Sequence, residues 1–79
     1  MNGKQMLLLN PPNFKEENKQ LGRFIRRHIM EFQGEIVESY PVPRTLFNDE
    51  GLAMAFVNKI SRSLSIPSAC FIVVTANRD

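Results

Sequence analysis

The chain has 79 residues, of which 43% are apolar and 23% are charged, and its net charge is +2. This length supports one domain over residues 1–79, because a second hydrophobic core would need roughly 50 further residues. The apolar share is that of globular proteins, which argues against an intrinsically disordered chain. Cys70 is the single cysteine, so the sequence excludes an internal disulfide and a zinc site built from several cysteines.

Hydropathy argues against a membrane protein. The most apolar run, residues 70–74, is far shorter than the roughly 20 residues that a membrane span requires. The first residues place one lysine ahead of three leucines without a small-residue cleavage site, so we interpret them as a strand and not as a signal peptide. Together with the lone cysteine, this predicts a cytoplasmic protein.

The first half of the chain is expected to form a strand, a helix and a second strand. The strand covers residues 4–9 and ends before two successive prolines, which lack the amide donor. Asn13 then suits the N-cap of a helix, whose apolar side chains recur at three- and four-residue steps as far as Phe32. We expect Gly34 to end this helix and residues 35–40 to form the second strand.

The proline-rich segment at residues 41–44 leaves two topologies open. If it is a turn, residues 45–47 form a third strand that pairs with the second; if it is a loop, strands and helices simply alternate. A second helix follows in either case, capped by Asn48 or Asp49 and carrying apolar residues at steps of four. The last strand is expected over residues 69–76.

These topologies correspond to two architectures. The first is an α+β ferredoxin-like βαββαβ sandwich, with two helices on one face of a four-stranded antiparallel sheet. The second is a three-stranded βαβαβ half of a doubly wound α/β sheet, in which each helix is a crossover. We favour the first, because a parallel sheet needs cover on both faces and a chain this short provides little core for that.

The first and last predicted strands are apolar on both of their faces. In a ferredoxin-like sandwich one sheet face carries no helices, so apolar side chains there stay exposed unless a second chain covers them. We therefore expect a homodimer.

The order of elements also carries a family resemblance. A Ser-Tyr strand leads into the sequence Pro-Val-Pro-Arg-Thr-Leu-Phe, a long basic helix precedes it, and an apolar last strand ends in Thr-Ala-Asn-Arg. This layout resembles the small ferredoxin-like proteins of the CRISPR-adaptation and VapD-type group, which includes a toxin-neutralising ribonuclease. The resemblance spans nearly the whole chain and implies a homodimeric fold and nucleic-acid contact. Nuclease members carry an aspartate where this chain has Asn10, and an amide does not replace a carboxylate as a metal ligand or base.

Basic residues on one side of the first predicted helix form the candidate functional surface. Cations spread along a helix face can follow a phosphate backbone, although such a face can also serve only to keep a small protein soluble. Two arginines beside strand ends are expected to extend the surface. The predicted nucleic-acid-binding residues are Lys15, Lys19, Arg23, Arg26, Arg27, Arg44 and Arg78.

No catalytic or cofactor motif is intact in the sequence. It has no glycine-rich cofactor loop and no paired histidines, so we assign no catalytic residue, no metal ligand and no cofactor. His28 is expected to pack near the end of its helix, and Cys70 to pack in the core. The sequence therefore favours a non-enzymatic, homodimeric regulatory or interaction module that binds RNA, DNA or a protein partner.

Two alternative functions remain open. One is a small metal-dependent ribonuclease that uses Asp49 or Asp79 in place of the missing strand-end aspartate. The other is a sensor of small anions on a half doubly wound sheet, at the carboxyl ends of its parallel strands. The residues expected to line that sensor site are Asn10, Asn13, Thr75 and Asn77.

Overall fold

A computed structural model describes residues 4–9, 15–39 and 42–76 of the chain. The elements, in chain order, are β1 (Lys4–Leu9), α1 (Lys15–His28), β2 (Gly34–Glu38), β3 (Arg44–Phe47), α2 (Glu50–Leu64) and β4 (Phe71–Ala76). Two short 3-10 segments, η1 (Ile29–Phe32) and η2 (Ser68–Cys70), follow α1 and α2. None of the helices in these residues is long and apolar enough to cross a membrane.

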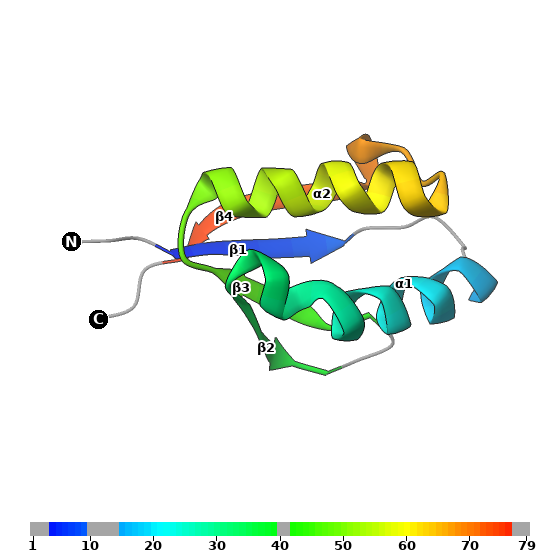
Figure 1. Ribbon diagram of the computed structural model, residues 1–79, viewed down its shortest axis with the longest axis horizontal. Helices are drawn as coiled ribbons and strands as arrows, with labels where there is room; N and C mark the ends of the chain where they lie inside the picture. Colours follow the sequence, from blue (N-terminus) through cyan, green and yellow to red (C-terminus); the bar gives the residue numbers. More distant parts are fainter. Residues whose placement is uncertain (1–3, 10–14, 40–41, 77–79) are drawn as a thin grey trace.

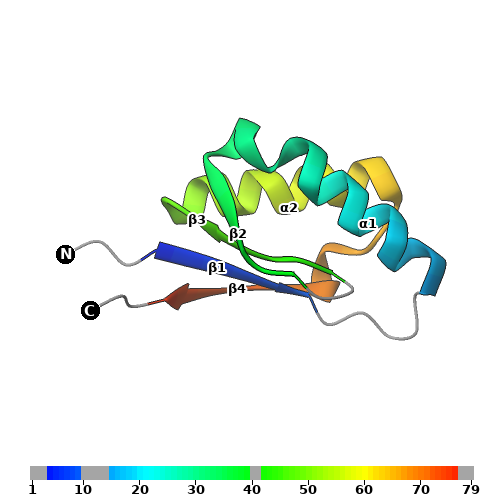
Figure 2. The same cartoon turned by 90° about the horizontal axis from the view of Figure 1, so that it is seen from below.

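The four strands form one sheet in the order β2-β3-β1-β4, and every neighbouring pair is antiparallel (Figure 1). Figure 2 shows both helices on the same side of this sheet. The architecture is the predicted α+β ferredoxin-like βαββαβ arrangement. The three-stranded parallel alternative is wrong, because β3 turns back after the proline-rich segment and pairs with β2.

The hydrophobic core lies between the helices and the sheet. Phe56 of α2 is at its centre, fully buried, with its ring centroid 5.4 Å from that of Phe47 on β3 and 5.1 Å from that of Phe32 in η1. Aromatic rings at such separations add to the free energy gained from burying them. The buried residues of this core are Leu7, Leu21, Ile25, Ile29, Phe47, Ala53, Phe56, Val57, Ile60, Ile66 and Phe71.

The end of α1 differs from the sequence-based expectation. The regular helix ends at His28, η1 continues the chain to Phe32, and Gln33 adopts left-handed backbone with a φ of 55°. Gly34 does not end the helix but is the first, buried residue of β2. The start of α2 follows one of the two predicted caps, because Asp49 Oδ1 accepts a hydrogen bond of 2.9 Å from the backbone N–H of Leu52.

Alternation along the strands divides the sheet residues between a helix-covered face and an uncovered face. Leu7 is buried under the helices and pairs with Thr45 and Val73. The residues one step along, Met6 and its partner Val74, therefore lie on the uncovered face. Val74 and Ile72 are the exposed apolar side chains of β4 on that face.

Candidate nucleic-acid interface

The basic surface of α1 is a consequence of the amphipathic pattern of that helix. Leu21 and Ile25 are buried in the core. At about 100° per residue, Arg23, Arg26 and Arg27 project away from those positions, and all three side chains are exposed. The part of α1 whose side chains are described thus brings together four of the predicted cations, the fourth being Lys19.

Two of these four cations already have partners. Lys19 Nζ lies 3.7 Å from the Glu16 carboxylate one turn earlier, and both side chains are exposed. Arg26 Nη2 donates a hydrogen bond of 3.1 Å to Ser39 Oγ, just after β2. Contacts of this kind contribute little stability. They nevertheless direct these two charges toward groups of the protein itself.

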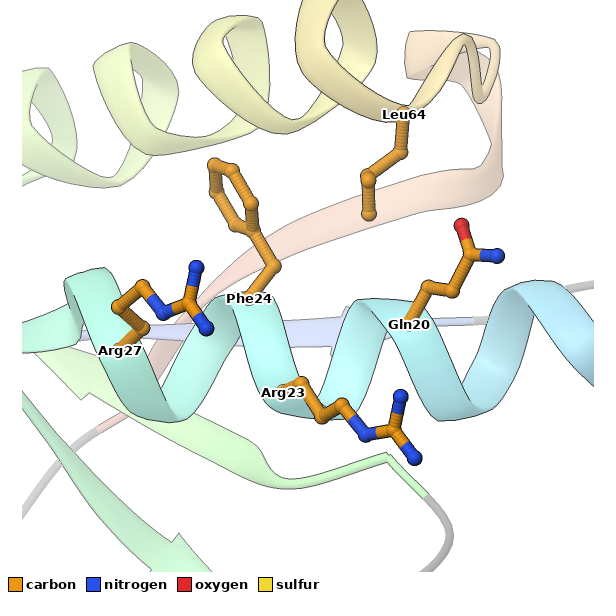
Figure 3. A pocket seen from close by; sticks show the side chains of 5 residues that line it. All are labelled: Gln20, Arg23, Phe24, Arg27 and Leu64. Atoms are coloured by element: carbon orange, nitrogen blue, oxygen red, sulfur yellow. The ribbon is translucent and has the colours of Figure 1, made fainter.

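Arg23 and Arg27 differ, since neither forms an ion pair or a side-chain hydrogen bond with any residue in the described ranges. Both line a hollow of about 230 Å³ between α1 and the end of α2. Figure 3 shows Phe24 of α1 and Leu64 of α2 projecting into the gap between the helices, with Gln20 and Arg27 on either side of Phe24. The hollow therefore has an apolar floor and a polar, positively charged rim.

This arrangement suits anionic oxygen ligands. Arg23 and Arg27 are four residues apart, so their side chains leave the helix from neighbouring positions on successive turns. A guanidinium presents a planar set of donors that matches a phosphate group and keeps its charge at every physiological pH. Figure 3 shows the two guanidiniums leaving α1 in different directions. Because neither has an ion-pair partner in the described ranges, each can contact an anionic group without breaking an existing ion pair.

His28 and Glu31 form a separate charged group at the end of α1. The His28 ring packs on Phe24 with 4.4 Å between centroids, and its Nδ1 lies 3.1 Å from Glu31 Oε1. Lys59 Nζ of α2 lies 3.3 Å from the same oxygen. The hydrogen bonds from His28 and then from Lys59 lower the pKa of Glu31. The partners of the Glu31 carboxylate are therefore His28 and Lys59, and not the arginines of the hollow.

Among the remaining predicted cations, Arg44 has a described side chain, and it is not brought to this surface. Arg44 precedes the helix-facing Thr45 on β3, so alternation places it on the uncovered face of the sheet. Its Nη1 there lies 3.2 Å from Glu38 Oε1. Arg78 and the side chain of Lys15 lie outside the described residues. Among the described side chains, the candidate interface therefore excludes Arg44 and is centred on Arg23 and Arg27.

Gln20, Phe24 and Leu64 were not anticipated as site residues. Phe24 and Leu64 belong to the apolar stripes that predict the two helices, and Gln20 has no distinctive pattern around it. The sequence does not distinguish an apolar residue at the edge of the contact between two helices from an apolar residue buried within that contact. Their role depends on the spacing of α1 and α2, which only the packed structure specifies.

Of the residues named for the alternative functions, the structure describes Asp49 and Thr75. Asp49 caps α2, while Asp79, Asn10, Asn13 and Asn77 lie outside the described residues. Among the described side chains, no group of three histidine, cysteine, aspartate or glutamate residues is placed to hold a metal ion. The antiparallel sheet lacks the edge of parallel strand ends that the sensor hypothesis required near Thr75. Cys70 is partly buried against the core.

Comparison with protein-family models, curated proteins and solved structures gave no match to this chain. The sheet order and the two helices on one face define a small α+β domain of ferredoxin-like topology.

Proposed function

We propose that the chain is a non-enzymatic nucleic-acid-binding module that contacts the phosphate backbone through Arg23 and Arg27 of α1. The observation that supports this most is the difference between the two arginines and their neighbours. Lys19 and Arg26 have partners within the protein, whereas Arg23 and Arg27 form no ion pair in the described part of the chain and line a hollow.

The energetics favour these two residues as the main contacts. Each phosphate contact releases counterions condensed on the nucleic acid, and this term supplies most of the non-specific affinity. A paired cation gives up its internal partner before it gains the phosphate, so Lys19 and Arg26 add less than Arg23 and Arg27. Gln20, at the rim of the hollow, supplies a neutral amide donor beside them.

The experiment is an affinity measurement by fluorescence anisotropy, with a labelled single-stranded RNA and a labelled DNA duplex at low salt. The test variant is Arg23→Gln with Arg27→Gln. Its matched control is Arg44→Gln with Arg62→Gln, which removes two exposed charges from β3 and α2. We expect the test variant to lose about tenfold in affinity or more, since each 1.4 kcal/mol is tenfold. The control should lose less than threefold, because only general charge attraction is reduced.

Two results would contradict the proposal. One is the absence of binding to either probe by the unmodified protein at low salt. The other is an equal loss of affinity in the test and control variants. Shortening of the RNA probe when magnesium or manganese is added would support the ribonuclease alternative instead.

We also propose that the module acts as a homodimer. Ile72 and Val74 are 47% and 38% exposed, and they lie on the sheet face that carries no helix. Covering β-branched side chains of this size is favourable by about 25 cal/mol for each Å² removed from water. Sedimentation equilibrium at micromolar concentration should give the mass of two chains. A single-chain mass there would contradict this part of the proposal.

A further inference from the structure

The two edges of the sheet are built differently. The β2 edge carries two exposed glutamates, Glu35 and Glu38, and its pairing with β3 has a register shift between Ile36 and Glu38. Charged side chains and bulges are the usual means by which an edge strand avoids pairing with another chain. The β2 edge is therefore protected.

The β4 edge has none of these protections. Its six residues include no charged residue and no proline. Its pairing with β1 is continuous from Ala76 opposite Lys4 to Phe71 opposite Leu9. On its other side β4 has no neighbouring strand in the described sheet. A regular, neutral, β-branched edge of this kind is a template for one more strand.

We propose that β4 pairs antiparallel with β4 of a second copy of this chain, centred on Val73, and joins the two sheets into one. The proposal rests on the homodimer proposed above and assigns the contact to the β4 edge, where Ile72 and Val74 gain contact with each other across the pair while the rest of the uncovered face stays open. A second copy suits the edge because two identical neutral strands meet without like charges opposite one another. Nothing in the described residues favours an unrelated partner strand over a second copy of β4.

The pleat of the sheet restricts the register of this pairing. Opposed residues of antiparallel strands point to the same face, so a residue of the uncovered face must meet another residue of that face. Centring the pair on Val73 places Ile72 opposite the partner's Val74, and Val74 opposite the partner's Ile72. The two most exposed apolar side chains of β4 are then each other's cross-strand neighbours.

This pairing also sets the orientation of the basic surfaces. Antiparallel strands within one sheet are related by a twofold axis perpendicular to that sheet, and such an axis keeps each face on its own side. Both pairs of helices would therefore lie on the same side of the joined sheet. The two copies of Arg23 and Arg27 would be carried by that one helix layer, available to a single polyanion.

The direct test is an isotope-filtered NMR experiment on a mixture of labelled and unlabelled protein, which records only contacts between chains. We expect contacts between the methyl groups of Ile72 and those of the partner's Val74. We also expect backbone contacts centred on Val73. A dimer without these contacts would overturn the β4 pairing but leave the homodimer, whereas a monomer would overturn both.

A pair of variants tests the same surface by sedimentation. Ile72→Lys introduces a charge at the β4 edge and should raise the dimer dissociation constant at least tenfold. Met6→Lys places the same charge on the uncovered face of β1, one strand inside the edge. It should change that constant less than threefold if the copies meet edge to edge. A larger rise in the dissociation constant for Met6→Lys than for Ile72→Lys would show that the sheets stack face to face and would overturn this inference. The Arg23 and Arg27 binding experiment is independent of either outcome.

Discussion

Gly34 and Ile29 approach each other so closely that no side chain fits between them. A Cβ added to Gly34 would lie 2.5 Å from Ile29 Cδ1 and 2.9 Å from Phe47 Cε1. The contact joins η1 to the first residue of β2, where both Gly34 and Ile29 are buried. Glycine inside a strand commonly marks such an approach of neighbouring groups.

We therefore expect Gly34→Ala to destabilise the fold by about 1–3 kcal/mol, the usual cost of overpacking a core. The free energy of unfolding is measured by urea denaturation. Gly51→Ala in α2 is the matched control, since the nearest atom to its added Cβ is Asp49 Oδ1 at 3.2 Å. The control should change stability by less than about 1 kcal/mol, because alanine is the better helix former. Equal losses in the two variants would contradict the packing explanation.

The sequence predicted the order of elements because each is marked by local chemistry. The four-residue steps of Leu52, Phe56 and Ile60 define α2, and Asp49 caps it as one of two predicted candidates. The end of α1 was predicted wrongly, because a glycine shortly after a helix commonly marks its end. Gly34 is instead required by its close contact with Ile29. That contact is tertiary and leaves no local pattern.

The candidate site was predicted less completely than the fold. The basic stripe of α1 is visible in the sequence, since helical periodicity alone places its cations together. Sequence spacing does not show which cations are paired. The partner of Arg26 is Ser39, thirteen residues away, and Arg44 is separated from α1 by the sheet itself. Both facts depend on how β2 and β3 pair.

Asp49→Ala should reduce stability by about 1 kcal/mol, because the Leu52 N–H then loses its cap. Asp49→Ser keeps an oxygen acceptor at the N-cap and should recover most of the loss. Thermal denaturation followed by circular dichroism compares the three proteins. A serine variant as unstable as the alanine variant would show that Asp49 has another role.

Thr45→Val is expected to stabilise the protein by roughly 1 kcal/mol. Thr45 is fully buried on β3, and its Oγ1 has no hydrogen-bond partner among the described residues. An unsatisfied buried hydroxyl costs free energy, and valine keeps the β-branched shape without it. Urea denaturation measures the change, and a loss of stability would show that the hydroxyl does have a partner.

Glu31 makes stability depend on pH in the acid range. The hydrogen bonds from His28 and Lys59 hold the pKa of Glu31 below its ordinary value of 4.5. A carboxyl group with a lowered pKa in the folded state stabilises the protein above its unfolded pKa and loses that contribution as pH falls through the folded pKa. Glu31→Gln should therefore cost stability at neutral pH and progressively less at acid pH. A difference between the two proteins that is the same at neutral and acid pH would contradict this.

Whether Arg23 and Arg27 contact phosphates is decided by the salt dependence of binding. The logarithm of the association constant is measured against the logarithm of salt concentration for the unmodified protein and for Arg23→Gln with Arg27→Gln. Each lost phosphate contact lowers the slope by about 0.9 on duplex DNA and about 0.7 on a single strand. Losing both contacts should therefore make the slope smaller by about 1.8 on duplex DNA or about 1.4 on a single strand. An unchanged slope would show that neither arginine neutralises a phosphate, and the proposed phosphate contacts would be wrong.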